Sequence, residues 1–289
     1  MYWLASQLLN AVIFDLFFLS FLSTFSFKCS CSSDSLSRNN SLPLNRMSGG
    51  WAHSCCSHDA LQVALSSEVH SIESDVVLSS VSGEPVMAHP PSTHSDLSFQ
   101  EFLEIATSDV DSARRKHLKL DFKDAEVVEP CLKALASKDL VEQTIYLNAD
   151  IIHGPGADSS SELKISADKF IDQCVTLYPR GILSLGWKVD LDIEGAVYSE
   201  KHCEEMLSIL QSHELLDRRI VLAVAARPLS RDSRSILTLM RESLPLAELL
   251  VWTGTGESPV TESLIEKIRE SFCEISSHRI SYDVALEIV

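Results

Sequence analysis

The chain contains 289 residues with a mass of 32.0 kDa, which is enough for one large domain or two small ones. Lys and Arg together number 24 and Asp and Glu 41, so the formal net charge is −17 and the pI is about 4.9. This acidity opposes binding to the phosphate backbone of nucleic acids and to anionic membrane surfaces, and we expect no nucleic acid partner.

The first part of the chain, residues 1–46, differs in composition from the rest. Residues 8–27 form an apolar run rich in Leu and Phe that suits the core of a signal peptide, although Asp15 interrupts it. A charge at the centre of a membrane helix costs about 3 kcal/mol, so we expect no stable membrane span here. Residues 29–45 are rich in Ser and Asn and predict a disordered linker.

Two interpretations of this leader are open. It is a signal or an anchor, or it is an extension of the gene model, because Met47 stands just before the patterned part of the chain. The first interpretation predicts a secreted or extracellular protein. The second predicts a cytoplasmic protein that begins at Met47.

From Met47 onward, short apolar runs alternate with longer amphipathic segments, which is typical of βα units and a parallel sheet. The predicted strands are 50–53, 71–77, 117–121, 144–147, 182–187, 220–225, 249–252 and 280–283. The predicted helices are 98–106, 125–136, 167–177, 199–210, 233–242 and 262–272. Eight strands, and no Gly-rich phosphate loop after any of them, favour a barrel over an open doubly wound sheet. We therefore predict an α/β fold, a single TIM-type (β/α)8 barrel over residues 47–289 with a disordered or cleaved leader.

Two carboxylates share one face of the second predicted strand. Glu73 and Asp75 point the same way because side chains alternate along a strand. Their repulsion is relieved by a proton, a cation or open water, so a divalent metal is a natural partner. After the turn at 83–85 the chain returns and brings His89 within reach of the same place. A solvated strand face would show the same pair, so this pattern alone does not establish a metal site.

Charged residues also alternate along the third predicted strand. Lys119, Asp121 and Lys123 share one face of this segment. If that face is the barrel interior, the charges must pair with one another, with a metal or with a substrate. The alternative is an edge strand whose charged face meets solvent.

The functional residues of such barrels gather at the C-terminal ends of the strands. Polar and aromatic side chains at these ends are predicted to line the mouth and contact the substrate: Lys119, Asn148, Asp150, Trp187, Arg227 and Trp252. The two tryptophans would serve equally well as packing caps.

Several separated motifs occur in a characteristic order: Trp51-Ala-His-Ser54, Met87-Ala-His-Pro-Pro91, Lys119-Leu-Asp-Phe-Lys123, Leu147-Asn-Ala-Asp150, Leu183-Ser-Leu-Gly-Trp187 and Trp252-Thr-Gly254. Together they resemble the menorin family, also called family with sequence similarity 151, from about Gly50 to the C-terminus. More distantly, the early motifs are similar to glycerophosphodiester phosphodiesterases and spider-venom-type phospholipases D. Those families are TIM barrels that hold a Mg²⁺ or Ca²⁺ ion.

The resemblance implies one role for each of six residues. In the phosphodiesterases a His ends the first strand, Glu-x-Asp ends the second, a His follows a short turn, and an acidic-x-Lys ends a later strand. The corresponding residues here are His53, Glu73, Asp75, His89, Asp121 and Lys123. Three features depart from that pattern. The acidic residue that usually opens the next helix in those families has no clear counterpart here unless Asp59 serves. Ser54 and Cys55 follow His53 where the phosphodiesterases have Arg-Gly, and Asp121 is one methylene shorter than the usual Glu.

These observations predict a metal-dependent, phosphodiesterase-like protein acting on a glycerophosphodiester or lysophospholipid-type substrate. Glu73, Asp75 and Asp121 would hold one Mg²⁺ or Ca²⁺ ion. The catalytic residues would be His53 and His89, which share acid and base roles, and Lys123, which neutralises phosphate charge.

Two alternatives come from other functional classes. The first is a catalytically inactive barrel that binds a protein partner, because a fold alone does not fix function. The second is a hydrolase that uses Cys55 or Cys56 as a nucleophile near His53. The eight cysteines lack the paired spacing of a zinc site and predict a mainly reduced protein.

Overall fold

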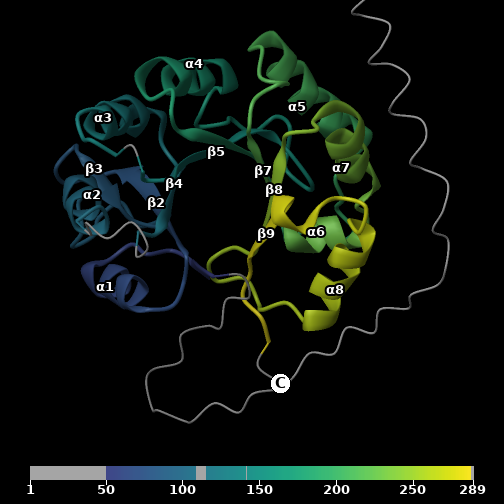
Figure 1. Cartoon of the computed structure of the whole chain (residues 1–289), viewed down its shortest axis with the longest axis horizontal. Helices are drawn as coiled ribbons and strands as arrows, with labels where there is room; N and C mark the ends of the chain where they lie inside the picture. The colour runs from purple at the N-terminus through teal and green to yellow at the C-terminus, as the bar shows by residue number, and fades with distance from the viewer. Residues whose placement is uncertain (1–49, 109–114, 141, 288–289) are drawn as a thin grey trace, which may run out of the picture. The chain divides into compact units, whose positions relative to one another are not determined.

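The computed structural model describes residues 50–108, 115–140 and 142–287. The predicted leader and its boundary near Met47 lie outside these residues. Within the described part, eight parallel strands follow one another around a ring (Figure 1). They are β1 (Trp51–Ala52), β2 (Ser71–Leu78), β4 (His117–Phe122), β5 (Ile145–His153), β6 (Ile182–Lys188), β7 (Val221–Ala225), β8 (Glu248–Trp252) and β9 (Ile280–Asp283). A short strand, β3 (Pro85–Met87), pairs antiparallel with β2 outside this path.

Helices surround the ring of strands, as Figure 1 shows. They are α1 (His58–Ser66), α2 (Phe99–Ala106), α3 (Ala125–Ala136), α4 (Ala167–Leu177), α5 (Glu200–Ser212), α6 (Ala226–Arg231), α7 (Arg234–Thr238) and α8 (Glu262–Ser271). A π-helical turn, Leu239–Ser243, continues α7, and a 3₁₀ turn, Ser277–Arg279, precedes β9. The predicted α/β barrel of the TIM type is therefore confirmed.

The barrel is nearly closed. Each strand pairs with the next from β1 to β9, and β1 lies beside β9. No hydrogen-bonded ladder joins those two strands in the part of the chain that the structure describes. We call this gap between β1 and β9 the seam.

Side-chain caps fix where several helices begin. Ser98 Oγ accepts a hydrogen bond from the Glu101 backbone N–H, while Glu101 Oε2 accepts one from the Ser98 N–H, which forms a capping box at the start of α2. Thr261 Oγ1 accepts from the Leu264 N–H at 3.2 Å and caps the start of α8. Of the helices described here, none combines the length and the apolar character needed to cross a bilayer.

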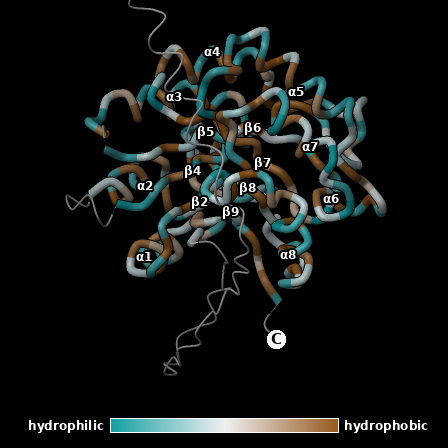
Figure 2. Tube along the Cα trace, turned by 45° about the vertical axis from the view of Figure 1, so that its right-hand side comes forward, coloured by the Kyte–Doolittle hydropathy of each residue, from teal (hydrophilic) through white to brown (hydrophobic). Residues whose placement is uncertain are grey.

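The barrel has two layers of apolar packing. Between strands and helices, the outward face of β4 packs with α3 in one continuous core: Leu118, Leu120, Phe122, Val127, Val128 and Leu132. Figure 2 shows hydrophobic stretches recurring along strands and helices, with hydrophilic stretches mainly toward the outside. A separate cluster joins four strands across the ring: Trp51, Tyr146, Val221 and Leu250. This inner cluster fills the interior of the barrel below the C-terminal ends of the strands, so a site at those ends would have an apolar floor.

The structure differs from the predicted elements in a few places. The short helices α1 and α6 and the strand β3 were not predicted. Strand β5 extends to His153, well past the predicted end at 147, because the polar residues that suggested a strand end face the barrel interior instead. The predicted helix 233–242 divides into α7 and the π-helical turn.

Candidate functional site

A cavity of about 230 Å³ opens at the C-terminal ends of the strands. It is lined by His53, Glu73, Asp75, His89, Lys119, Asp121, Lys123, Asn148, Asp150, Trp252, Gly254 and Thr255. All predicted site residues except Trp187 and Arg227 therefore meet in one place. Parallel strand ends share one edge of a barrel, which is why residues so far apart in the sequence converge here.

Strand register explains the arrangement of the charges. Glu73 lies opposite Lys119, and Asp75 lies opposite Asp121, in the parallel pairing of β2 with β4. Asp121 in turn lies opposite Asn148 on β5. Because side chains alternate along each strand, these residues face the interior while their apolar neighbours face the helices.

Two lysines, the buried Lys119 and the half-buried Lys123, pair with the carboxylates. Lys123 Nζ lies 3.1 Å from Asp75 Oδ1 and 2.9 Å from Asp121 Oδ2. Lys119 Nζ lies 3.8 Å from Glu73 Oε1 and 3.7 Å from Asp121 Oδ2. Burial alone would lower the pKa of both lysines, but the neighbouring carboxylates outweigh it and raise each pKa above its usual range. Both ammonium groups therefore stay charged at neutral pH.

The carboxylates have divergent proton affinities. Burial and the charge of Glu73 raise the pKa of Asp75 to about 6. Burial also raises the pKa of Asp150 to about 6, although Lys123 opposes the change. For Asp121 the effect of burial is overcome by Lys123 and Lys119, which hold its pKa below the usual range. Such divergence among clustered acids is typical of functional sites.

The histidine after β1 is held from two sides. His53 Nδ1 lies 2.9 Å from Asp283 Oδ2 and 3.4 Å from Glu73 Oε2. Burial alone would lower the pKa of His53, but Glu73 and Asp283 raise it to about 9. Ser54 follows with φ +55°, a left-handed conformation that turns its backbone N–H onto Glu73 Oε2 at 2.8 Å.

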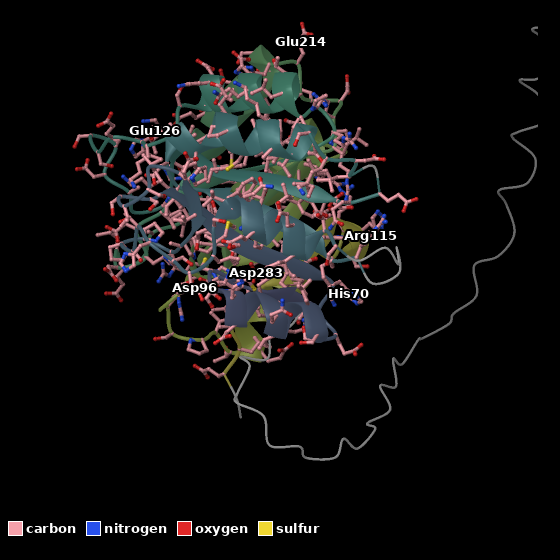
Figure 3. The ribbon with its side chains drawn as sticks, turned by 90° about the vertical axis from the view of Figure 1, so that its left-hand side faces the viewer. His70, Asp96, Arg115, Glu126, Glu214 and Asp283 are labelled. Atoms are coloured by element: carbon pink, nitrogen blue, oxygen red, sulfur yellow. The ribbon has the colours of Figure 1, made fainter. Side chains whose placement is uncertain are left out.

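Asp283 was not among the predicted site residues. It ends the last predicted strand, so its position was the one available signal for a role in the site. Its side chain is fully buried, and Figure 3 shows it within the body of the barrel, whereas Arg115, Glu126 and Glu214 lie at the outside.

His89 enters the cavity from the segment after β3. Its Nδ1 lies 2.9 Å from the Pro90 carbonyl oxygen, which can only accept, so Nδ1 carries the proton. In the neutral ring, Nε2 is then the acceptor. The two histidines of the cavity therefore differ in the partner that fixes each ring.

The carboxylates fit a hard divalent cation. Glu73, Asp75 and Asp121 offer oxygen atoms that all lie within 4.8 Å of one another. Asp121 Oδ1 and Asp283 Oδ1 are buried and have no hydrogen-bond partner among the described residues. An unsatisfied buried carboxylate oxygen is costly, and oxygen is the ligand that Mg²⁺ and Ca²⁺ prefer.

Comparison with known proteins identifies the family of the chain. The family model of the menorin N-terminal domain matches residues 46–288. The chain belongs to the menorin family. The human protein named Protein FAM151B is 32% identical to it over 241 residues, which cover 81% of each chain. The family resemblance carried by the separated motifs is thus confirmed for the barrel.

Two residues of the predicted mouth lie elsewhere in this menorin-family barrel. Trp187 is completely buried, with its ring edge-on to Tyr198 and its Nε1 donating to the His202 carbonyl at 3.2 Å. It faces the helices because it follows the interior-facing Gly186, so the expectation of substrate contact is wrong. Arg227 pairs with Glu257 and donates to the Ser258 carbonyl, so it anchors the segment after β8 and does not line the cavity.

The cysteine-nucleophile alternative is not supported in the menorin-family site. Burial and the charge of Asp75 raise the pKa of Cys56 to about 11, and burial also raises the pKa of Cys55 well above its usual range. A nucleophilic cysteine needs a lowered pKa because the thiolate is the reactive form. Both thiols stay protonated at neutral pH.

Proposed function

We propose that this menorin-family chain is a metal-dependent, phosphodiesterase-like enzyme acting on a glycerophosphodiester or lysophospholipid-type substrate. One observation carries the proposal, namely the excess of carboxylates inside the barrel. Five acids face two lysines there: Glu73, Asp75, Asp121, Asp150 and Asp283 against Lys119 and Lys123. With His53 protonated, two negative charges remain unbalanced. One divalent cation would balance them, since buried charge is tolerated only when compensated.

The proposed ion ligands are Glu73, Asp75 and Asp121, whose oxygens already converge. A bound Mg²⁺ or Ca²⁺ would act as a Lewis acid toward an oxygen of the phosphodiester. Lys123 and Lys119 would supply positive charge to the other phosphate oxygens from their positions beside Asp121.

The two histidines divide the proton transfers. The Asp283 carboxylate holds His53 Nδ1, so the proton on His53 Nε2 is the one available to the leaving alkoxide. His89 Nε2, as an acceptor, would take the proton from the attacking water or substrate hydroxyl. One proton is taken and one is given, so the pair ends each cleavage with exchanged protonation states.

The proposal is tested with the full chain, Mg²⁺ or Ca²⁺, and glycerophosphocholine or lysophosphatidylcholine, followed by ³¹P NMR. This readout registers loss of the diester whichever bond breaks. We expect ion-dependent turnover that falls about 10²–10⁴-fold in His53→Asn and His89→Asn. His94→Asn is the matched control because His94 is exposed. Full activity in either site variant would remove that histidine from the mechanism.

A second candidate function follows from Lys123. Its ammonium already lies between two of the proposed ion ligands, Asp75 and Asp121, as a barrel working without an ion would require. In that case the chain would be a catalytically inactive, protein-binding module. A folded chain that takes up no ion and cleaves no diester, but retains a purified protein partner, would favour this function.

A further inference from the structure

A groove adjoins the candidate site at the seam of the barrel. Its volume is about 630 Å³, and it shares His53, Gly254 and Thr255 with the smaller cavity. From there it runs beside α1 to Ser67 and Val69, near the start of β2. Figure 1 shows α1 and α8 on either side of this region. A ligand whose phosphate lies in the candidate site could therefore continue directly into the groove.

The groove differs chemically from the site it adjoins. Aliphatic side chains line its length: Ala52, Ala60, Val63, Ala64, Val69 and Ala285. Among the described residues, no lysine or arginine lines it. Its acidic residues are Asp59 and Glu257, and Glu257 is already engaged by Arg227 and by the Gly254 N–H. Such a surface does not suit a second phosphate or any polyanion.

We infer that the groove holds the hydrocarbon chain of an amphipathic phosphodiester. The inference rests on the proposed function and narrows it, because it selects a lysophospholipid-type substrate over a glycerophosphodiester that lacks a chain. Continuity with the phosphodiester site and the aliphatic lining are the observations that carry it. A volume of this size falls within the usual range of ligand pockets.

Binding of a homologous series tests the inference. Glycerophosphocholine and hexyl-, octyl- and decylphosphocholine, each below its micelle-forming concentration, are titrated with Ca²⁺ into the full chain carrying His89→Asn. Removing the proposed base keeps the ligands intact. A fully buried methylene is worth about fourfold in affinity. Because the groove is open, we expect affinity to rise about two- to fourfold with each added methylene.

Variants in the groove should remove this dependence. Ala60→Asp places a charge among the aliphatic residues in the first turn of α1, where an acidic residue suits the helix. Val63→Asp does the same one turn later, at a side chain that is 44% exposed. Val81→Asp is the matched control because Val81 is 84% exposed and does not line the groove. The two groove variants, Ala60→Asp and Val63→Asp, should remove the increase of affinity with chain length and leave the affinity for glycerophosphocholine unchanged.

Equal affinity for every chain length would overturn the inference. This is also the result expected if residues 1–49 or a second copy of the chain filled the groove instead of the ligand. A dependence that survives Ala60→Asp and Val63→Asp would overturn it as well. The proposed function is judged separately by diester cleavage. Chain-length dependence without cleavage would support the groove alone, and cleavage without chain-length dependence would support the proposed function alone.

Discussion

Asp283 Oδ2 lies 2.9 Å from His53 Nδ1, so the last residue of the final strand is bonded to the histidine that follows the first strand. The other oxygen of Asp283 is buried without a hydrogen-bond partner among the described residues. This contact crosses the seam, where no backbone ladder joins β1 to β9 in the described part. The two ends of the barrel are thus connected through side chains of the candidate site.

Replacing this acid should impair the site more than the fold. In Asp283→Asn we expect turnover of the proposed substrate to fall about 10–100-fold, because outer groups that orient a functional histidine have effects of this size. The ¹⁵N signals of His53 should also titrate at a lower pH, because the charge of Asp283 helps to raise the pKa of His53 to about 9. Asp168→Asn is the matched control, since Asp168 holds His213 at the same 2.9 Å on the surface. Unchanged turnover and unchanged His53 signals would exclude a positioning role for Asp283.

Gly186 leaves space for a site carboxylate. A Cβ added there would lie 2.4 Å from Asp150 Oδ1, so that carboxylate must shift. We expect Gly186→Ala to cost about 1–3 kcal/mol of unfolding free energy, as overpacking does. The cost should nearly vanish in an Asp150→Ala background, which urea unfolding of the double-mutant cycle measures. Gly254→Ala is the control, because its nearest contact would be an ordinary 3.6 Å. A cost independent of Asp150 would contradict this account.

The two tryptophans should respond in opposite ways. Trp187→Phe removes the hydrogen bond to the His202 carbonyl and part of a completely buried ring, so we expect a loss of about 1–3 kcal/mol in stability. Its effect on diester affinity should be negligible. Trp252→Phe should weaken diester affinity with little loss of stability, because Trp252 lines the cavity. Denaturant unfolding and ligand titration of both variants measure the two effects, and the reverse result would show that the assignments are exchanged.

The N-terminus of α5 should be sensitive to acid. His202 Nδ1 accepts from the Ser199 N–H at 3.2 Å, which only an unprotonated nitrogen can do. Burial lowers the pKa of His202 below its ordinary 6.5, so the unfolded chain binds this proton more readily. The hydrogen bond of His202 in the cap therefore contributes about 1 kcal/mol to the free energy of unfolding above pH 6.5. This contribution is lost as the pH falls below 6.5.

Comparing the stability of the natural chain with that of His202→Gln at two pH values isolates the effect of protonating His202. His202→Gln preserves an acceptor at the same position of the capping box but does not titrate. Urea unfolding at pH 7.5 and at pH 5.5 should show a smaller loss of stability for the variant than for the natural chain. Equal losses would mean that His202 does not contribute.

Much of the barrel was predictable because its strands alternate polar and apolar residues. The alternation of Lys119 and Asp121 with Leu118, Leu120 and Phe122 left two possibilities for β4, an interior charged face or a solvent-facing edge, and the structure has the first. Adjacent strands in parallel register then had to bring these charges together. Sequence periodicity captures such arrangements because both the face and the edge of a strand follow from chain order.

Other features depend on partners that chain order does not reveal. Trp187 was predicted to lie at a strand end and contact the substrate. It lies instead on the face of β6 that points toward the helices, where its ring packs edge-on against Tyr198. Asn148 and Asp150 were predicted to lie at a strand end, yet both lie inside β5, where Asn148 Oδ1 accepts a hydrogen bond from Ser184 Oγ on the neighbouring strand. The contact between Asp283 and His53 spans nearly the whole barrel sequence.

Calorimetric titration of Mg²⁺ and Ca²⁺ into the full chain tests the central claim most directly. We predict saturable binding of one ion, lost in Glu73→Gln/Asp75→Asn, a variant that preserves shape but removes two proposed ligands. Asp168→Asn/Asp172→Asn removes two exposed acids instead and should bind normally. Circular dichroism checks that all three proteins are folded. Absence of binding by the folded natural chain, even with a phosphodiester present, or equal binding by the site variant, would contradict the proposed metal mechanism.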